Sequence, residues 1–373
     1  MNANALQIST ANPLDGSLRN IWNELAGAML FRRYEWAESW LSTFGKECEP
    51  RVAVVRDSAG EVVGIAPFCL RRMTRATKAL ELIGGAKACG DELSLLVRPG
   101  LEPAVVEEIA GWLVADRAAG VWDELWLTGV DGGDQVIALL EQALSDAGAH
   151  MKPIEDQSRW VCPLPSCFED YASSLGKSSR RLLRQALKKV DDPKQNNRLR
   201  FAEDETSRQE YLEIAEQLHE MRWQGLEGGG CFSHAHFRDF IDRVTREWLQ
   251  EEKLHLAVLW IDEEPAAAAI SAECGGTFSI YLTGRNPRFD DRHAGWMMNF
   301  SLVRRAIKNG AHTLDMLRGD EAYKQRLGAR QAPQLIYYVS GRGVRNCVRG
   351  LSYTGREQMK KWTRQWSKTE VQD

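Results

Sequence analysis

The sequence predicts an α/β protein with two similar domains, each built around a mixed sheet. Two segments of alternating hydrophobic residues, 51–57 and 61–70, are joined by a short turn and are typical of a β-hairpin. A second hairpin of the same plan occupies residues 256–271, and its first strand begins 204 residues after the first one (Leu256 against Val52). Repetition of a structural unit at a steady spacing indicates a duplicated domain.

A helix that stops at a glycine recurs in each half. The first opens at Pro103, a residue suited to the first turn, and stops at Gly120. The second covers residues 296–309 and stops at Gly310, which lies 190 residues after Gly120. A strand follows each helix directly. The near-constant spacing favours duplication, and the alternative is that any two α/β domains share hairpins and glycine-stopped helices.

The remaining elements complete this pattern. Strands are expected at residues 80–83, at 93–97 and near Trp160, with a helix at 134–147. The sequence therefore divides into a flexible N-terminus (1–14), an N-terminal domain (15–160), a C-terminal domain (161–345) and a helical C-terminal tail (346–373).

Composition and charge exclude several classes of protein. Lys and Arg number 48 against 52 Asp and Glu, and a net charge of −4 does not fit a DNA-binding protein or a polybasic membrane binder. No stretch approaches 18 apolar residues, so no membrane span is expected. The eight cysteines are scattered through apolar segments, which is typical of buried thiols in a cytoplasmic protein.

A basic amphipathic helix is predicted at about residues 178–190, in the segment that joins the halves. One face is apolar, and the other carries six cations within thirteen residues: Lys177, Arg180, Arg181, Arg184, Lys188 and Lys189. Such a face is either solvated or binds an anion. The second interpretation is noteworthy because the chain as a whole is acidic.

No metal site is predicted. Cys231, His234 and His236 lie within six residues, but no fourth ligand is spaced to complete a site. The sequence also has no Walker loop, dinucleotide fingerprint, zinc-protease helix or Cys-x-x-Cys pair, which excludes the commonest cofactor classes.

A candidate anion site lies further along the second half. A strand at 277–283 ends at Gly284, an irregular loop follows, and a helix starts at Gly295. The first-turn amides of a helix lack internal acceptors and its dipole favours negative charge, so this order of elements suits a phosphate. Arg292 and His293 add positive charge just before the helix.

The next strand, 313–317, leads into the block Gly319-Asp320-Glu321-x-Tyr323-Lys324-x-x-x-Gly328. With the basic helix, the end of the strand at Tyr281–Gly284 and the helix start at Gly295, this block makes residues 166–339 resemble the GNAT acyltransferase superfamily. The stretch looks like the branch of cellulose-biosynthesis (CelD/BcsL-type) acetyltransferases, which is related to the tandem-domain FemAB aminoacyltransferases. The resemblance implies tandem GNAT-like domains with a C-terminal helix.

The resemblance also implies a donor site. In GNAT proteins one strand splays from its neighbour and pairs with the pantetheine arm of acyl-CoA, and the next loop holds the pyrophosphate. The implied residues are Tyr281, Leu282 and Thr283 for the arm and Arg292, His293, Ala294, Gly295 and Trp296 for the pyrophosphate. The usual Gln/Arg-x-x-Gly-x-Gly/Ala loop is absent and only Gly295 has an equivalent place, which keeps an aminoacyl-tRNA donor open.

Three positions are implied in catalysis. Tyr323 occupies the place of the phenol that protonates the leaving thiolate, and Asp320 or Glu321 would accept the proton of the attacking amine or hydroxyl. Packing is the alternative for Tyr323, and a helix cap is the alternative for Asp320. Arg180, Arg184 and Lys324 are expected to contact substrate.

We therefore expect a cytoplasmic N- or O-acyltransferase with acetyl-CoA or another acyl-CoA as cosubstrate. Its acceptor would be a small molecule or glycan, such as a sugar, polysaccharide or cell-envelope precursor. One alternative is a FemAB-like aminoacyl transferase, for which tRNA is the partner. Another is a non-catalytic GNAT-fold protein that binds or regulates. The sequence leaves the oligomeric state open.

Overall fold

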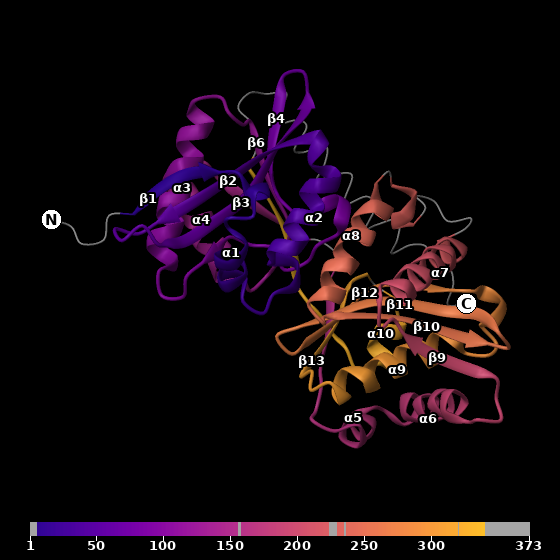
Figure 1. Ribbon diagram of the computed structural model, residues 1–373. Coiled ribbons are helices and arrows are strands. Elements are labelled where there is room, and N and C mark those ends of the chain that lie inside the picture. Colours follow the sequence, from indigo (N-terminus) through magenta and orange to yellow (C-terminus); the bar gives the residue numbers. More distant parts are fainter. Residues whose placement is uncertain (1–5, 156–157, 224–229, 235, 320, 340–373) are drawn as a thin grey trace, which may run out of the picture.

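The computed structural model describes residues 6–155, 158–223, 230–234, 236–319 and 321–339 (Figure 1). The predicted C-terminal helix, residues 346–373, lies outside the described residues.

The first half of the chain supplies seven strands and four helices before the chain crosses to the second sheet. The strands are β1 (Gln7–Ala11), β2 (Cys48–Arg56), β3 (Val62–Thr74), β4 (Thr77–Leu82), β5 (Leu96–Val97), β6 (Glu124–Asp131) and β7 (Met151–Glu155). The helices are α1 (Arg19–Ala26), α2 (Tyr34–Phe44), α3 (Glu102–Ala118) and α4 (Gln135–Asp146). The predicted hairpin at 51–70 and the helices opening at Pro103 and at 134 are confirmed.

The second half has the same kinds of elements. Its strands are β8 (Arg159–Pro163), β9 (Asn197–Phe201), β10 (Leu254–Ile261), β11 (Glu264–Cys274), β12 (Thr277–Arg285), β13 (Thr313–Arg318), β14 (Arg330–Ala332) and β15 (Gln334–Val339). Its helices are α5 (Phe168–Ser174), α6 (Lys177–Asp191), α7 (Glu205–Trp223), α8 (Phe237–Gln250), α9 (Ala294–Lys308) and α10 (Tyr323–Arg326).

Two mixed sheets of one plan confirm the predicted fold class. The first has the order β1-β2-β3-β4-β6-β15-β7, with β5 beside β3, and the second has the order β9-β10-β11-β12-β13-β8-β14. Position by position the two orders correspond, and the only parallel pairs among the described strands are β4–β6 in the first sheet and β12–β13 in the second. In Figure 1, α7 and α8 lie on one face of the second sheet, and α5, α6 and α9 lie on the other.

Strand β15 departs from the predicted division of the chain. The sequence placed residues 161–345 in the C-terminal domain, but β15 pairs with β6 and β7 of the first sheet. The chain crosses between the sheets at Pro333, whose carbonyl accepts the Gly132 N–H at 2.9 Å. The correction has a physical reason: β7 pairs with β15 alone among the described strands, so the first sheet needs β15 to hold its edge. Apart from β15, the predicted boundary between the two domains, at residues 160 and 161, stays a proposal.

The parallel pair in the second sheet is short, and this shapes the site. β12 and β13 pair at three positions, from Thr277–Thr313 to Ser279–Asp315, although β12 continues to Arg285. On its other edge β12 stays paired with β11 to its end, with a β-bulge at Tyr281. The two strands therefore diverge beyond Ser279 and leave an opening between them.

The equivalent opening in the first sheet is filled. β4 and β6 also pair at three positions, but the chain's own loop after β4 enters the space beyond them. The Leu93 N–H donates to the carbonyl of Gly129 on β6 at 2.9 Å. The loop lies so close that a Cβ on Gly129 would come within 2.2 Å of the Gly90 carbonyl oxygen, so only glycine fits there.

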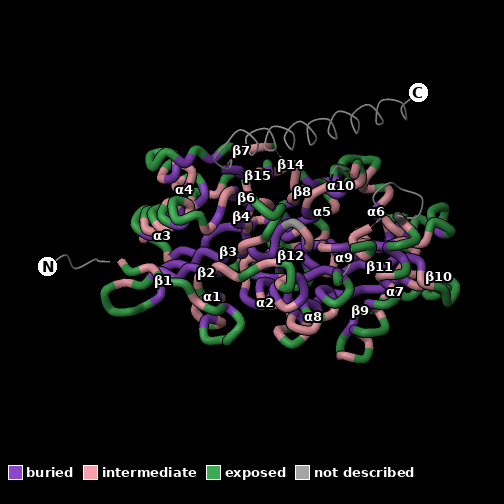
Figure 2. Tube along the Cα trace, turned by 90° about the horizontal axis from the view of Figure 1, so that it is seen from above, coloured by how far each residue is buried: buried purple, intermediate pink, exposed green. Residues whose placement is uncertain are grey.

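A continuous hydrophobic core joins the two halves. It runs from the first sheet through α2 and α8 to one face of the second sheet, while a separate core lies between the other face and α5, α6 and α9 (purple in Figure 2). Trp36 is at the junction, with ring centroids 6.0 Å from Trp248 and 5.5 Å from Tyr281. The second half is thus packed on the first through aromatic side chains.

Buried charges connect the halves beside this core. Asp91, fully buried in the first half, accepts from Arg318 Nε on β13 at 2.7 Å and from Gln334 Nε2 at 2.7 Å. Within the second sheet Asp315, also fully buried, accepts from Arg159 Nη1 at 2.8 Å. Burial raises the pKa of Asp315 to about 7, because Arg159 offsets only part of the cost of removing a carboxylate from water.

Asp315 makes the stability of the protein depend on pH. A carboxyl whose folded pKa lies above its ordinary value of 3.8 binds a proton more tightly in the folded state. We expect the free energy of unfolding to fall as pH rises from about 4 to about 7 through this group. Asp315→Asn, which stays neutral, should flatten that slope in urea unfolding measured across this range. Asp262→Asn in an exposed turn is the control, and an unchanged slope in Asp315→Asn would contradict the assignment.

Candidate active site

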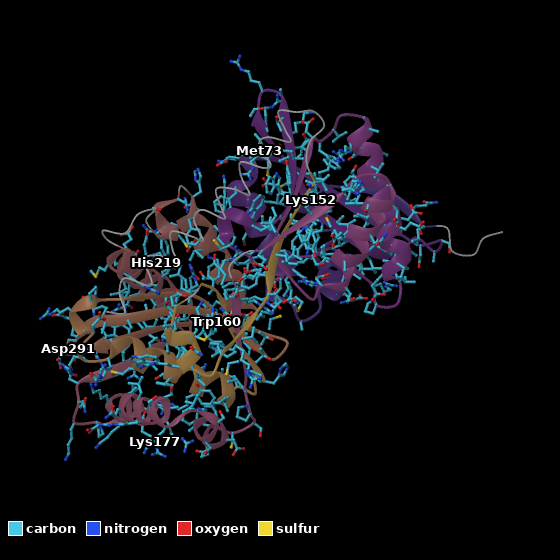
Figure 3. All side chains as sticks on the ribbon, turned by 180° about the vertical axis from the view of Figure 1, so that it is seen from behind. Met73, Lys152, Trp160, Lys177, His219 and Asp291 are labelled. Carbon is cyan, nitrogen blue, oxygen red and sulfur yellow. The ribbon has the colours of Figure 1, made fainter. Side chains whose placement is uncertain are left out.

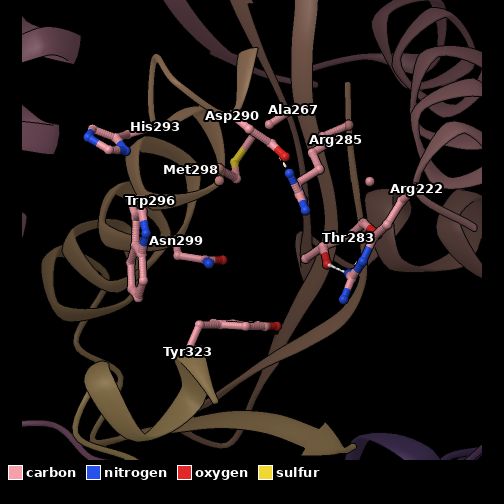
Figure 4. A pocket seen from close by; sticks show the side chains of 13 residues that line it. Arg222, Ala267, Thr283, Arg285, Asp290, His293, Trp296, Met298, Asn299 and Tyr323 are labelled. Atoms are coloured by element: carbon pink, nitrogen blue, oxygen red, sulfur yellow. Dashed lines mark hydrogen bonds and ion pairs between the residues drawn. The ribbon is translucent and has the colours of Figure 1, made fainter. Parts of the chain in front are cut away.

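The opening between β12 and β13 leads to a cavity of about 340 Å³ in the second half (Figure 4). Its walls come from the end of β12, the first turns of α9, the last turn of α7 and the short helix α10. The side chains that matter for its chemistry are Arg222, Thr283, Arg285, His293, Trp296 and Tyr323. These residues are up to 101 positions apart in the chain, and the splayed strands bring them together.

The start of α9 gives the cavity its anion-binding character. The N-cap residue His293 has a left-handed backbone (φ 67°) and its side chain makes no capping hydrogen bond. The helix is 15 residues long; the Trp296 N–H donates to the His293 carbonyl at 3.0 Å, and the two amides before it are first-turn amides of the kind that lack a partner within a helix. A Cβ on Gly295 would meet only Arg285 Cδ, at 3.8 Å, so this face of the helix is open toward the cavity.

Two arginines line the opposite wall (Figure 4). Arg222 donates to Thr283 Oγ1 at 2.8 Å and to Glu321 Oε1 at 3.2 Å. Arg285 forms an ion pair with Asp290. Burial and the repulsion of the nearby Arg222 cation lower the pKa of Arg285. An anionic ligand would relieve that repulsion.

Tyr323 projects from α10 into the cavity, as Figure 4 shows, and its ring lies edge-on to Trp296 with centroids 6.4 Å apart. Burial raises the pKa of Tyr323 to about 12, and the Glu321 carboxylate adds to the shift. The phenol therefore keeps its proton at neutral pH and is available as a hydrogen-bond and proton donor in a reaction.

The predicted donor-binding residues separate into two groups. Thr283, His293, Gly295 and Trp296 line the cavity. The other four do not. Tyr281 donates from its hydroxyl to the Ala88 carbonyl at 2.7 Å, and Leu282 is part of the core that joins the halves. Arg292 pairs with Asp262 at 3.0 Å, and Ala294, the first residue of α9, is buried in the separate core of the second half. The bulge at Tyr281 explains the first case, because it breaks the alternation of side chains along β12.

The predicted catalytic carboxylates are not equivalent. Glu321 is held by two cations, Arg222 at 3.2 Å and Lys324 at 3.1 Å. Burial opposes its ionisation, but these cations together keep the pKa of Glu321 below its usual value. Asp320 lies outside the described residues.

Lys324 does not fit its predicted contact with substrate. Its side chain is buried, and Nζ donates to the carbonyls of Leu317, Arg318 and Gly319 at 3.1, 2.9 and 3.1 Å. All three protons of the ammonium are thereby used inside the protein, and burial lowers the pKa of Lys324. The residue fixes the end of β13 instead.

The other two predicted substrate contacts lie on α6, outside the cavity. Arg180 donates to the carbonyls of Ser173 and Leu175 at 2.6 and 3.0 Å, so it helps to hold the turn before α6. Arg184 is exposed and lines a separate open groove that includes Arg326 of α10.

Arg222 and Arg285 line the cavity but are not among the site residues predicted from the sequence. Arg285 is the last residue of β12 and could have been found as a cation at the strand end that faces the helix. Arg222 lies 61 residues before Thr283 on a helix with no motif of its own, so nothing in the local sequence points to it.

Comparisons with known proteins agree with this geometry. Residues 177–325 match the family model described as an acetyltransferase (GNAT) domain. Among solved structures, FemX is similar with 12% identity and a TM-score of 0.62, over 89% of this chain and 97% of that one. L-PGS from Bacillus licheniformis is similar with 14% identity and a TM-score of 0.55, over 92% and 96%. A tandem GNAT protein from the clavulanic acid biosynthesis pathway is similar with 12% identity and a TM-score of 0.51, over 91% and 99%. The comparison with curated proteins gives no match.

The match over residues 177–325 supports the predicted GNAT domain in the second half, and the likeness to FemX at 12% identity shows a shared fold. The matched segment contains the splayed strands and the cavity, and the tandem arrangement of the whole chain is that of known tandem GNAT folds. Among the described residues, no helix has the length and apolar character needed to cross a bilayer, and no group of three or more His, Cys, Asp and Glu is placed to hold a metal ion.

The role of Lys324 can be tested through stability. Lys324→Met would leave three carbonyls without their donor and remove one of the two cations beside Glu321, so we expect a loss of about 1–3 kcal/mol in the free energy of unfolding by urea. Arg326→Met, on the same short helix but exposed, is the matched control and should change stability little. Equal stability of the two variants would show that the buried ammonium does not hold β13.

Proposed function

We propose that this protein is an acyl-CoA-dependent N- or O-acyltransferase of the CelD/BcsL type. Its donor is acetyl-CoA or another acyl-CoA, and its acceptor is an amine or hydroxyl of a sugar, polysaccharide or cell-envelope precursor. The observation that carries the proposal is the opening between β12 and β13, which leads directly to the first turn of α9. Because acyl-CoA is a cytoplasmic metabolite, we place the reaction in the cytoplasm.

The donor fits the cavity by its chemistry. Beyond Ser279 the edge of β12 that faces β13 has no strand partner among the described residues, and the amides of a pantetheine arm can take its place. The diphosphate would lie at the first turn of α9, close to Arg285 and His293. The first half offers no such place because the loop around Gly90 fills its opening. We therefore assign the donor to the second half alone.

The cavity also supplies the proton that the reaction needs. The acceptor nitrogen or oxygen attacks the thioester carbonyl, the C–S bond breaks as the tetrahedral intermediate collapses, and the thiolate takes a proton. Tyr323 is the proposed donor of that proton, since its phenol stays protonated inside the cavity. Glu321 is a weak base because two cations hold it, so we assign proton removal from the acceptor to Asp320 or to a water.

A FemAB-like aminoacyl transferase is the second candidate, and a specific observation favours it. An open groove of about 1030 Å³ follows α6, at the outer edge of the second half (Lys177 in Figure 3). Its cations are Lys177, Arg180, Arg181, Arg184 and Arg326, and Arg326 lies on the same short helix as Tyr323. Such a surface suits the phosphates of a tRNA. A non-catalytic protein that only binds a ligand is the third candidate.

The donor site is tested at Gly295. Gly295→Glu would place a carboxylate beside the diphosphate, and like-charge juxtaposition costs several kcal/mol, so we expect CoA affinity to fall roughly tenfold or more by calorimetry. Gly295→Ala is the matched control, because a Cβ has room at 3.8 Å from Arg285. Unchanged CoA affinity in Gly295→Glu would remove the site from this helix. Binding of aminoacyl-tRNA by a wild-type protein that ignores CoA would favour the second candidate.

The catalytic role of Tyr323 predicts a selective kinetic effect. Tyr323→Phe keeps the ring but removes the proton donor, so we expect kcat to fall about 10²–10⁴-fold with little change in KM. Release of free thiol with a panel of amino sugars measures this. Tyr211→Phe, outside the cavity, is the control. Full turnover by Tyr323→Phe under conditions in which chemistry limits the rate would make the phenol a packing residue.

A further inference from the structure

Two cysteines that the proposed reaction does not use lie against each other where the two halves of the chain meet. Cys89 follows the short 3-10 helix Ala86–Ala88 of the first half, and Cys231 opens the short 3-10 helix Cys231–Ser233 of the second. The Cys231 thiol is hydrogen-bonded to the Cys89 sulfur, and both residues are present as reduced thiols. They are 142 positions apart in the chain, so the fold alone brings them together.

The loop that holds Cys89 is fixed against the second half on both sides of the cysteine. The carbonyl of Ala88 accepts from the Tyr281 hydroxyl at 2.7 Å, and the carbonyl of Gly90 accepts from Arg318 Nη2 at 3.0 Å. Cys89 itself has a left-handed backbone (φ 51°), a conformation that costs free energy for a residue with a Cβ. The first half therefore presents this thiol to the second in a constrained conformation.

Cys231 is fixed in position by contacts within the second half. Its carbonyl accepts the His234 N–H at 3.1 Å, and the next ring, Phe232, lies edge-on to His219 and to Phe237 with centroids 5.3 and 5.2 Å away. Both cysteines are only partly buried. The other contacting pair differs in one member: Cys69 is fully buried, beside the partly buried Cys48 on the neighbouring strand.

We propose that Cys89 and Cys231 are a redox-sensitive pair that forms a reversible disulfide between the two halves of the protein. The oxidant is a hydroperoxide, whose O–O bond is broken. One cysteine sulfur attacks the peroxide and becomes a sulfenic acid, with release of water or an alcohol. The second sulfur then attacks the first, the S–S bond forms and water leaves. Two thiols lose two electrons and two protons, and a dithiol reductant reverses the change by exchange.

The surroundings indicate which sulfur reacts first. The hydrogen bond to Cys89, followed by burial, raises the pKa of Cys231, so Cys231 keeps its proton and donates it. Cys89 accepts that hydrogen bond, so we assign the first attack on the peroxide to its sulfur. The Arg318 cation acts on Cys231 in the opposite direction, but it is outweighed by the hydrogen bond and by burial.

The proposal is tested on the full chain by mass mapping. The reduced protein is titrated with hydrogen peroxide, remaining thiols are blocked with N-ethylmaleimide, and a non-reducing digest is analysed. We expect one linked peptide that joins Cys89 to Cys231, and its loss on treatment with dithiothreitol. Cys89→Ser and Cys231→Ser should each abolish it, whereas Cys48→Ser, which breaks the other contacting pair, should not.

A second measurement uses no variant in its main comparison. A bond that closes a loop of this length restricts the unfolded chain, so the oxidised wild type should have a higher Tm than the reduced one. Cys231→Ser should show no such rise, and its reduced Tm reports whether it folds normally. The proposal is overturned if peroxide converts Cys89 and Cys231 to separate sulfinic acids, if the bridge joins Cys48 to Cys69 instead, or if both thiols remain open to N-ethylmaleimide after the other thiols have been oxidised.

Discussion

The early end of pairing between β12 and β13 is the constraint on which the rest of the site depends. Both strands are held at the point of divergence by the same loop of the first half. Tyr281, the bulged residue of β12, bonds to Ala88, and Arg318 at the end of β13 bonds to Asp91. From inside the second half, Lys324 fixes the three carbonyls that end β13. The cavity is therefore a product of the whole chain, although its walls come from the second half.

The two sheets share one strand order, but the opening beside the parallel pair has a different use in each. Each sheet breaks its single parallel pair after three positions, so each has the geometry to admit an extended ligand. In the first half the loop after β4 enters that space and supplies Asp91 for the contact with Arg318. The space that would receive a donor in the second half is therefore filled in the first half by a loop, and this loop holds the two halves together.

Much of the fold could be predicted from the sequence, because the hairpins, the glycine-stopped helices and the basic helix follow local periodicity. The site was only partly predictable. Thr283, Gly295 and Tyr323 lie in segments with recognisable patterns, whereas Arg222 reaches the cavity from a helix that carries no motif. Lys324 was expected to contact substrate, but it is buried, and only the three surrounding carbonyls explain why a lysine lies there.

The position of β15 determines when the protein can fold during synthesis. β6 and β7 are made early, yet the strand that lies between them is encoded at residues 334–339. Until that segment leaves the ribosome, the first sheet has an open gap with unpaired strand edges, which are prone to wrong pairing between chains. The first half is thus a poor unit for independent folding or for expression as a fragment, because β15, the last strand among the described residues, completes its sheet.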